Sequence, residues 1–578
     1  MHTHKGIPCM TGIAVGEALV APRDVEHRIH RRHVAPEDAA REEEKSRTAL
    51  AKAAEEIDRE VAQLRGYAGV ASKILEFHKA LILSPDLAQE IRAHILDAHM
   101  SAEFAVFTVM RRWHAHFAGL TSEAAAQKVH DLMDVERRIM RYIVGGAMWD
   151  LAGLDREVVL VAHTLTPSQA ASLGKTKVKG FATDIGGKTA HTAIMARAMA
   201  VPAVVGTGDL SLRVQDGQTV IIDGLEGLVI VDPDTETLDR YREQERRHRA
   251  AFDALVAEHD LPAETLDGYE VEVLANIELA EEAEIALAMG AHGVGLYRTE
   301  FLYEECHEPS EDMQYDVYQE VARALGGRPC IIRTMDLGAD KFAHEGQQEG
   351  ERNPFLGSRS IRYSLQRPEL FMVQLRAILR ASVAGDVRLL FPMISVIEEL
   401  REAKRHLARA KEELAARGVP FRPHIPVGIM VEVPSAALTV DQLAREVDFL
   451  SIGTNDLVQY ALAVDRVNER VAHLYQPGSP AITRLLRHII AVAQNLSIGV
   501  CVCGEMSADP RFVLLLLGLG LREYSVAPVA APLVKHIVRS VSLAQAEAFA
   551  EKTLGLATAE ECDAFMSERL AALLPNLR

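Results

Sequence analysis

The residues with the clearest chemistry lie at the ends of short apolar runs in the second half of the sequence. An apolar run that repeatedly ends in a charged or reactive residue is typical of buried strands whose ends share one functional edge. Salt bridges along that edge explain any single residue equally well, but together the residues favour a binding site. They are Arg298 (in GVGLYR), Arg333 (IIRTMD), Glu432 (GIMVEV), Asn455 and Asp456 (SIGTND), and Cys503 (VCVC).

These residue types suit a small, doubly anionic phosphorylated acid. Guanidinium groups offer paired donors to phosphate or carboxylate. The candidate arginines are Arg298, Arg333, Arg359 and Arg466. Glu432 and Asp456 supply the hard oxygens that anchor Mg²⁺ together with a substrate phosphate. At Cys503, a pKa lowered by an electropositive surrounding would allow acid, base or nucleophile chemistry, whereas the residue type alone favours a buried small hydrophobe.

A second candidate site is a histidine that follows a glycine turn, in TDIGGKTAHTAIMAR. Gly186 and Gly187 follow a short strand, and His191 begins a helix. A helix N-terminus stabilises an anion beside it, so the position suits a phosphohistidine, in which the imidazole attacks a phosphoryl group. The default interpretation of a single histidine at a helix start is an ordinary surface residue. A P-loop is excluded, because GxxxxGK[ST] would need glycine where Ala182 stands.

Eight β-rich runs position the first set of residues. They lie at 271–277, 293–298, 330–335, 387–394, 426–432, 448–453, 498–503 and 522–525. Helical patterns such as 398–417 and 482–495 lie between them. Eight buried strands that alternate with helices predict a (β/α)₈ barrel, a fold of about 250 residues whose chemistry sits at the C-terminal ends of the strands.

The first half of the chain predicts an α/β domain with a helical insertion. Residues 5–19 and 158–232 have strand-like runs broken by glycines, whereas 37–144 is glycine-poor and has apolar residues at helical spacing. The three apolar stripes are Leu50, Ala53, Ile57, Val61 and Leu64; Phe104, Phe107, Met110, His114 and Phe117; and Val129, Leu132, Val135, Ile139 and Ile143. The charged stretch 237–261 predicts a solvated linker helix.

We therefore expect an α/β multidomain protein with four parts. They are an α/β phosphohistidine domain (1–22 and 148–232), an inserted helical subdomain (23–147), a linker helix (233–262), and a (β/α)₈ barrel with C-terminal helices (263–578).

Composition narrows the class of protein. The formal net charge of −19 argues against nucleic acid or an anionic membrane as the main partner. The longest apolar run, FVLLLLGLGL, is too short to cross a bilayer, which takes about 20 residues. The start, MHTHKGIPCM, lacks the basic and apolar regions of a signal peptide, and the six cysteines are scattered rather than spaced as a disulfide framework. We expect a reduced, cytoplasmic protein.

Taken together, the motifs resemble enzyme I of the bacterial phosphoenolpyruvate-dependent sugar phosphotransferase system over nearly the whole chain. GGKTAHTAIMAR is similar to the phosphohistidine loop of that family. The barrel motifs follow in the expected order: GVGLYRTEFL, RTMDLGADK, NPFLGSRSIR, FPMI, GIMVEVPSA, SIGTNDLVQYALAVDR, LYQPGSP and CGEM. The resemblance implies Mg²⁺-dependent phosphorylation of His191 by phosphoenolpyruvate, then transfer to a histidine of the small carrier HPr, with pyruvate as product.

The resemblance also implies roles for single residues. Those that would bind phosphoenolpyruvate are Arg298, Arg333, Asn455 and Arg466, with Arg359 and Asp456 beside them. Glu432 and Asp456 would hold Mg²⁺, and Cys503 would protonate enolpyruvate at carbon. The insertion at 23–147 would dock HPr, and the barrel would form a homodimer. One departure is that Cys501 and Val502 precede Cys503, where the family usually has Gly-Met.

Two other functions compete with this interpretation. Phosphoenolpyruvate synthase and pyruvate phosphate dikinase share the histidine and barrel modules, but they need an ATP-grasp domain, and the helical, glycine-poor residues before 148 do not fit one. A non-catalytic scaffold that only binds a carrier protein would not need arginine, carboxylate and thiol groups at the strand ends.

Overall fold

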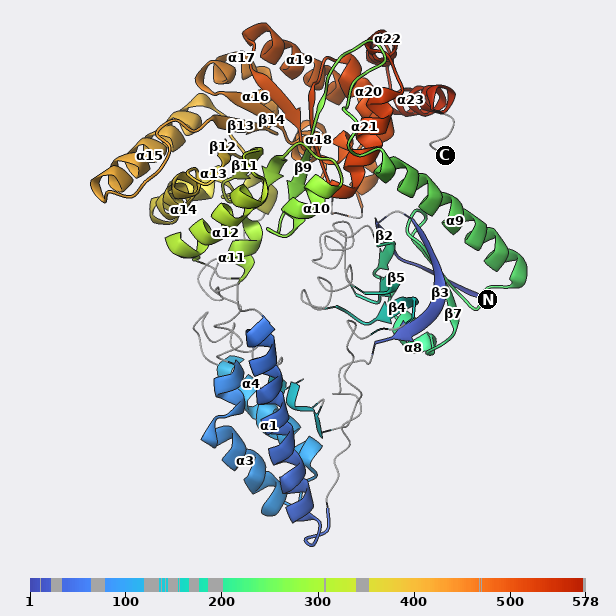
Figure 1. Cartoon of the computed structure of the whole chain (residues 1–578), viewed down its shortest axis with the longest axis vertical. Helices are drawn as coiled ribbons and strands as arrows, with labels where there is room; N and C mark the ends of the chain where they lie inside the picture. The colour runs from blue at the N-terminus through green and yellow to red at the C-terminus, as the bar shows by residue number, and fades with distance from the viewer. Residues whose placement is uncertain are drawn as a thin grey trace. The chain divides into compact units, whose positions relative to one another are not determined.

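The computed structural model (Figure 1) divides into two compact units. The first contains Met1–His248, and the second contains Arg249–Phe342 and Gly350–Arg578. The structure describes residues 1–10, 12–21, 34–63, 78–118, 156–165, 176–185, 201–305, 308–338, 353–466 and 470–574, and also 132, 135, 136, 138–140, 142, 143, 154 and 468. None of the helices in these ranges has both the length and the apolar character that a membrane span requires.

One sheet of eight strands forms the α/β part of the first unit. Its strands are β1 (His2–Lys5), β2 (Ile7–Met10), β3 (Ile13–Val20), β4 (Val158–Ala162), β5 (Val178–Thr183), β6 (Ala203–Val205), β7 (Thr219–Asp223) and β8 (Leu228–Val231). They lie in the order β1-β8-β7-β3-β4-β5-β6-β2. The chain leaves the sheet after β3 and returns at β4, which pairs with β3 in parallel. The residues between these two strands are therefore an insertion into the sheet domain.

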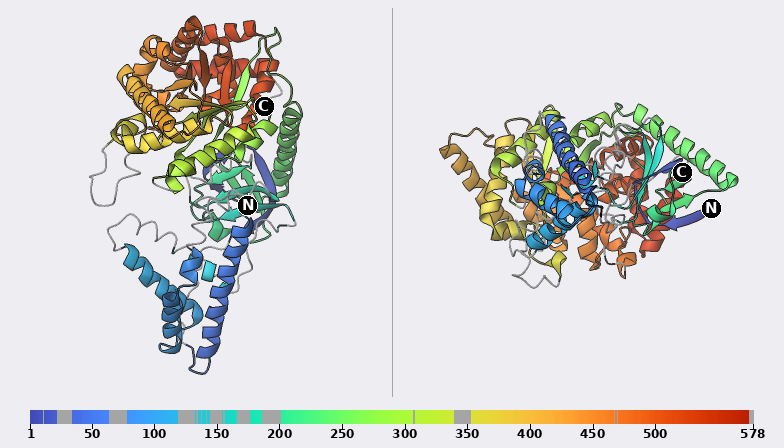
Figure 2. Two further views of the ribbon diagram at one scale, coloured as in Figure 1. Left: turned by 60° about the vertical axis from the view of Figure 1, so that its left-hand side comes forward. Right: turned by 90° about the horizontal axis from the view of Figure 1, so that it is seen from below.

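The insertion is helical, as the glycine-poor pattern predicts. Its longer helices are α1 (Ala39–Gln63), α3 (Pro85–Leu96) and α4 (Ala102–Ala118), which Figure 2 shows side by side in blue. Leu132, Val135, Ile139 and Ile143 of the third predicted stripe are buried in the same core.

The predicted stripe on α4 is correct at Met110, which is fully buried, and wrong at its phenylalanines. Phe104 and Phe107 are only half-buried, and the fully buried face carries smaller side chains instead. These are Ala102, Ala105, Val106, Val109 and Met110. Small residues allow neighbouring helices to approach closely, so shape complementarity outweighs the larger apolar area of phenylalanine here.

Helix α9 (Thr235–Ala257) covers most of the charged stretch that predicts a linker helix. Its first turns are tied to the sheet of the first unit. The hydroxyl of Tyr241 donates to Asp223 Oδ2 over 3.1 Å, and Glu245 Oε1 accepts the backbone N–H of Val15 over 3.1 Å.

The predicted (β/α)₈ barrel is confirmed in the second unit, where eight parallel strands close on themselves. The strands are β9 (Glu272–Ile277), β10 (Val294–Tyr297), β11 (Pro329–Arg333), β12 (Asp386–Phe391), β13 (Val427–Val431), β14 (Phe449–Ile452), β15 (Gly499–Val502) and β16 (Glu523–Val526). Helices such as α12 (Glu311–Ala324), α14 (Pro368–Ala381), α15 (Ile397–Ala416) and α19 (Pro480–Leu496) surround them (Figure 1). Side chains that point inward fill the barrel: Leu296, Ile331, Leu390, Met430, Phe449 and Cys503.

A single carboxylate joins three helices of the outer layer. Glu311, the first residue of α12, accepts from Arg376 over 2.6 Å, from Arg380 over 2.9 Å and from Arg417 over 3.2 Å. Burial alone would raise the pKa of Glu311, but the three guanidinium groups lower it from 4.5 to about 2. The carboxylate is therefore charged in the folded protein over a wider pH range than in the unfolded chain.

We predict that Glu311→Gln destabilises the barrel by about 1–2 kcal/mol at neutral pH. Because the folded pKa lies below the unfolded one, the stabilisation is complete above pH 4.5 and is lost as the pH falls toward 2. Urea unfolding at several pH values measures the free energy of unfolding of wild type and variant. The difference between the two should be constant from pH 7 to about 5 and should become smaller below that pH. Glu412→Gln, at an exposed position on α15, is the control. A gap that does not change with pH would contradict this account of Glu311.

Candidate active site

The C-terminal ends of the parallel barrel strands meet at one mouth, and the residues predicted from the strand ends lie there. Arg298, Arg333, Glu432 and Cys503 each end or directly follow a strand, and Asn455 and Asp456 lie in the first turn of α18 (Thr454–Leu462). The fold thus gathers residues that are up to about 200 positions apart in the sequence at one edge of one domain.

The centre of the mouth is a chain of buried charge pairs. Asp336 accepts from Arg333 over 2.8 Å and from Arg359 over 3.0 Å. Arg333 also contacts Glu300 at 3.1 Å, and Arg359 contacts Asp456 at 3.3 Å. Burial acts to raise the pKa of Asp336, but the two guanidinium groups lower it. The pKa of Arg333 is raised by Glu300 and Asp336 in spite of its burial, so this arginine stays charged.

One N–H group of Arg333 is not used in these charge pairs. Its Nε is buried and has no hydrogen-bond partner among the residues that the structure describes. A buried N–H without a partner is costly, and an anionic substrate oxygen would satisfy it.

A buried polar network behind the mouth fixes the turn that carries Arg333 and Asp336. The side chain of Gln374, on α14, accepts the backbone N–H of Met335 over 3.0 Å and donates to the hydroxyl of Thr299 over 3.1 Å. Thr299 in turn donates to the carbonyl oxygen of Arg333 over 3.0 Å. The helix layer therefore holds the backbone on both sides of the charged residues.

Glu432 is the carboxylate with the most unusual environment. It is buried, and its Oε1 accepts the backbone N–H of Met393 over 2.7 Å. Burial, and then the nearby carboxylates of Asp336 and Asp456, raise the pKa of Glu432 well above its ordinary value. A buried carboxylate beside others of like charge favours a proton or a cation as its partner. No group of three His, Cys, Asp or Glu side chains suited to a metal ion occurs in the described parts of the chain.

Two carboxylates nevertheless fit a magnesium site of the kind in which substrate oxygens and water complete the coordination. Glu432 and Asp456 supply hard oxygen donors. Burial, and then the charges of Asp336 and Asp456, raise the pKa of Glu432, and a divalent cation beside these carboxylates would favour its charged form.

The remaining predicted residues lie around this centre. Arg298 pairs with Glu278 at 2.5 Å, and Asn455 Oδ1 accepts the backbone N–H of Glu505 over 3.0 Å. The backbone N–H of Arg466 donates to the side chain of Gln459 over 3.2 Å. The contacts of Arg298 and Asn455 fix their side chains, and the contact of Arg466 fixes its backbone.

Tyr475 links Asn455 and Arg466. Its hydroxyl donates to the carbonyl oxygen of Asn455 over 3.3 Å. Burial raises the pKa of Tyr475 to about 12, although the charge of Arg466 acts in the opposite direction. Tyr475 belongs to the motif LYQPGSP, but it lies twenty positions from Asn455, and the sequence alone assigns it no role.

Cys503 is buried, as its residue type alone favours, and the alternative of a lowered pKa is not met. The side chain is 3% exposed and lies among the apolar residues inside the barrel, where Ser451 Oγ donates to its Sγ over 3.2 Å. Burial raises the pKa of Cys503 above its ordinary value, although Ser451 acts to lower it. Burial therefore outweighs the electropositive surroundings that would lower the pKa of this thiol. A neutral thiol is a proton donor rather than a nucleophile at neutral pH.

Cys501 is also a buried thiol, on β15 itself. Burial, together with the charge of Glu523, raises the pKa of Cys501 well above its ordinary value. Cys501 pairs in register with Ser451 on β14, one layer below Cys503. This position suits a packing residue inside the barrel.

His191 lies outside the described residues, as do Gly186 and Gly187. The strand that leads to them, β5, is followed by Asp184, which is buried and firmly held. Ser211 donates to Asp184 with its backbone N–H over 2.9 Å and with its hydroxyl over 2.6 Å, and His163 Nδ1 lies 3.1 Å from Asp184 Oδ2. The start of the histidine segment is therefore anchored to the sheet.

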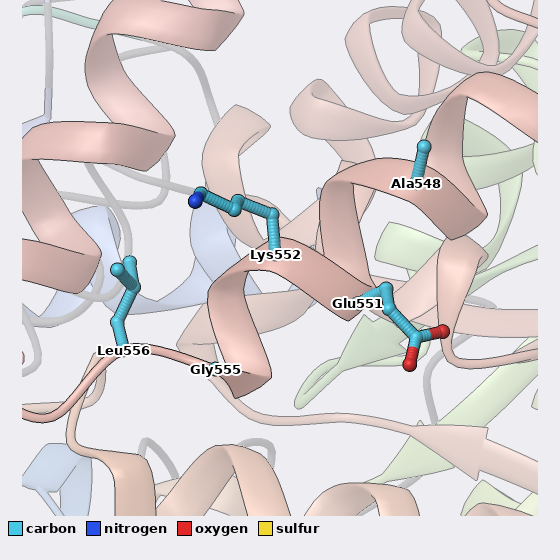
Figure 3. Close-up of a pocket in the computed structure, with 5 residues that line it drawn as sticks. All are labelled: Ala548, Glu551, Lys552, Gly555 and Leu556. Atoms are coloured by element: carbon cyan, nitrogen blue, oxygen red, sulfur yellow. The ribbon is translucent and has the colours of Figure 1, made fainter.

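A shallow surface hollow of about 430 Å³ lies at the end of α22 (Leu543–Leu554), and Figure 3 shows the residues that line it. They are Ala548, Glu551, Lys552, Gly555 and Leu556. None of the predicted site residues is among them, so this hollow is separate from the candidate active site.

Comparison with known proteins shows relatives over the whole chain. The matching family descriptions are "PEP-utilising enzyme, N-terminal" over residues 5–128, "PEP-utilising enzyme, mobile domain" over 154–227, and "PEP-utilising enzyme, PEP-binding domain" over 253–543. The phosphoenolpyruvate-protein phosphotransferase of Geobacillus stearothermophilus is 40% identical over 571 residues, which cover 98% of this chain and 97% of that protein. The chain belongs to the phosphoenolpyruvate-protein phosphotransferase family.

A second phosphotransferase and a solved structure are also similar to this chain. The phosphoenolpyruvate-protein phosphotransferase of Bacillus subtilis (strain 168) is 39% identical over 573 residues, which cover 98% of this chain and all of that protein. An NMR solution structure of an Enzyme I protein is 35% identical, covers 43% of this chain and 99% of its own, and has a TM-score of 0.34. The charge pairs described above lie within the segment that matches the PEP-binding domain of these phosphotransferases.

We predict that the two cysteines of this phosphotransferase differ in function. Cys503→Ala should nearly abolish pyruvate formation, because it removes the buried proton donor at the mouth. Cys501→Ala should leave the rate within a few-fold of wild type, because a packing residue affects chemistry only indirectly. Steady-state pyruvate release under identical Mg²⁺ and carrier concentrations measures both. An inactive Cys501→Ala beside an active Cys503→Ala would reverse the assignment.

Proposed function

We propose that the chain takes a phosphoryl group from phosphoenolpyruvate onto His191 and passes it to a histidine of the carrier HPr, with release of pyruvate. In the sugar phosphotransferase system this reaction is the first step of sugar uptake. The observation that carries the proposal is the chain of buried arginine–carboxylate pairs at the barrel mouth, in a protein of this family.

The arginines suit the two anionic groups of phosphoenolpyruvate. We assign phosphate and carboxylate binding to Arg298, Arg333 and Arg466, together with the amide of Asn455. The unpartnered Nε of Arg333 supports this assignment, because it needs an acceptor when the site is closed from water. Arg359 contacts Asp336 and Asp456 and adds positive charge beside the substrate. Fixed donors of this kind hold the phosphoryl group in line for transfer.

Glu432 and Asp456 would hold the Mg²⁺ ion, jointly with oxygens of the substrate. When bound, the ion neutralises the charge that develops on the transferring phosphoryl group. Arg359 keeps Asp456 oriented through its 3.3 Å contact, and the backbone N–H of Met393 orients Glu432.

Transfer of the phosphoryl group to His191 leaves enolpyruvate, which becomes pyruvate when a proton is added at C3. We assign this proton to Cys503. The raised pKa of Cys503 keeps the thiol protonated at neutral pH, and its position directly after β15 puts it at the mouth beside the arginines.

The domain limits and the partners are part of the same proposal, and membership of the family supports them. We propose that the helical subdomain (23–147) docks HPr, that the sheet domain (1–22 and 148–232) carries His191, and that the linker (233–262) joins it to the barrel (263–578). We also propose a homodimer formed through the barrel domain and a cytoplasmic location.

We predict that His191→Ala abolishes acid-labile, base-stable labelling by phosphoenolpyruvate labelled in the phosphoryl group. The change removes the nucleophile and leaves the barrel intact, so phosphoenolpyruvate should still bind to the variant. His424→Ala, at an exposed position in the barrel domain, is the matched control and should label normally. Stable histidine-type label on His191→Ala would disprove the assignment of the nucleophile.

We also predict that Glu432→Gln and Asp456→Asn each raise the Mg²⁺ concentration for half-maximal phosphorylation at least about tenfold, because each removes a charged ligand. The amides keep the size of the side chains, so the thermal midpoint should change little. Asp441→Asn, at an exposed position on α17 (Val440–Leu443), is the control. Unchanged Mg²⁺ titrations of both site variants would contradict this metal site.

A further inference from the structure

Ser451 is a fully buried hydroxyl inside the barrel, and it contacts the thiol assigned as the proton donor. It lies on β14 with 0% exposure, and its Oγ donates to Cys503 Sγ over 3.2 Å. The sulfur is its hydrogen-bond partner among the residues that the structure describes. Cys503 belongs to an apolar cluster inside the barrel that includes Leu296, Met430 and Phe449. A lone hydroxyl in such a place has a large effect on any charge that forms beside it, because little water is present to screen that charge.

The charged groups around the thiol come from three other strands. Arg298 after β10 and Arg333 on β11 favour a thiolate at position 503, whereas Glu432 after β13 disfavours it. Cys501, on the same strand, is a neutral thiol, because burial raises its pKa well above the ordinary value. Burial of Cys503 opposes the thiolate as well. Ser451 is thus a neutral hydrogen-bond donor that favours the thiolate, as the two arginines do, whereas burial disfavours it.

We propose that Ser451 is a positioning residue for the proton transfer to carbon: its hydroxyl orients the Cys503 thiol and stabilises the thiolate that the transfer leaves. This inference rests on the proposed role of Cys503. In the step, the S–H bond of Cys503 breaks and its electron pair stays on sulfur. The π electrons of the enolate form the new C3–H bond, and the enolate oxygen becomes the ketone oxygen of pyruvate. One negative charge moves from enolate to thiolate, and a solvent proton later restores the thiol.

The hydrogen bond from Ser451 to Cys503 should have a measurable effect on the rate of proton transfer to carbon. Loss of a hydrogen bond to a buried charged group slows a step that forms the charge by about tenfold to a hundredfold. Because the hydroxyl stabilises the thiolate, its loss also raises the pKa of Cys503 and makes it a weaker acid. A group that merely fills space in the barrel would lower stability without changing the acidity of its neighbour.

The test is the pH profile of pyruvate formation in single turnovers with phosphoenolpyruvate and Mg²⁺. The acid must be protonated, so the wild-type rate should fall as the pH rises through the pKa of Cys503. Ser451→Ala should lower the plateau about tenfold to a hundredfold and move the falling limb to higher pH by about one to two units. Ser451→Thr keeps the donor and should keep the limb near its wild-type position. Ser382→Ala removes another fully buried hydroxyl, at the end of α14, and should leave the profile unchanged.

The outcomes separate this inference from the proposed function. Suppose that Cys503→Ala is inactive and that the rate of Ser451→Ala falls at the same pH as the wild-type rate. This result overturns the role of Ser451, whether the plateau rate is unchanged or lowered. Wild-type pyruvate formation by Cys503→Ala overturns the role of the cysteine itself, and the inference with it. Thermal midpoints of Ser451→Ala and Ser382→Ala show whether the two variants are equally well folded.

Discussion

Two buried arginines share one carboxylate at the barrel mouth, and the arrangement of the site depends on this contact. Arg333 and Arg359 both donate to Asp336, at 2.8 and 3.0 Å. Removing a guanidinium group from water costs several kcal/mol, and only close pairing offsets this. Asp336 therefore has to sit between the two arginines, and this fixes the distance between them. Among the described residues, Arg333 Nε has no hydrogen-bond partner in this arrangement.

The fold supplies the rigidity that such a contact requires. Arg333 ends a strand that is hydrogen-bonded on both sides within a closed barrel, and Gln374 holds the turn that follows it. Burial, and then the neighbouring carboxylates of Asp336 and Asp456, raise the pKa of Glu432. The barrel mouth thus combines fixed positive donors for an anionic substrate with a place for a divalent cation. One fold element, the end of a parallel strand, provides both.

The sequence predicts the barrel and most of the mouth because strand ends are easy to recognise from apolar runs. Arg298, Arg333, Glu432 and Cys503 were identified in this way. The sequence does not predict the hydrogen-bond partners of these residues, because a hydrogen bond between distant segments leaves no sequence pattern. Ser451 and Gln374, for example, look like ordinary residues of a strand and a helix. Glu300 lies within the motif GVGLYRTEFL, two residues after Arg298, but its contact with Arg333 depends on the packing of two strands.

Physical effects that depend on burial were the hardest to predict. An electropositive surrounding would lower the pKa of Cys503, but its burial in the barrel raises the pKa instead. On α4 the apolar stripe was assigned to the large side chains Phe104 and Phe107, whereas close helix packing selects the small ones. In both cases the residue type is known from the sequence, and its distance from solvent is not.

The central claim is that the fixed guanidinium group of Arg333 binds phosphoenolpyruvate at the barrel mouth. Isothermal titration of phosphoenolpyruvate in the presence of Mg²⁺ tests it with Arg333→Lys, which keeps the charge but removes the planar pair of donors. Arg405→Lys, at an exposed position on α15, serves as the control. The account predicts that binding to Arg333→Lys is weaker by about tenfold or more while Arg405→Lys binds like wild type. Equal affinities of Arg333→Lys and wild type would contradict it.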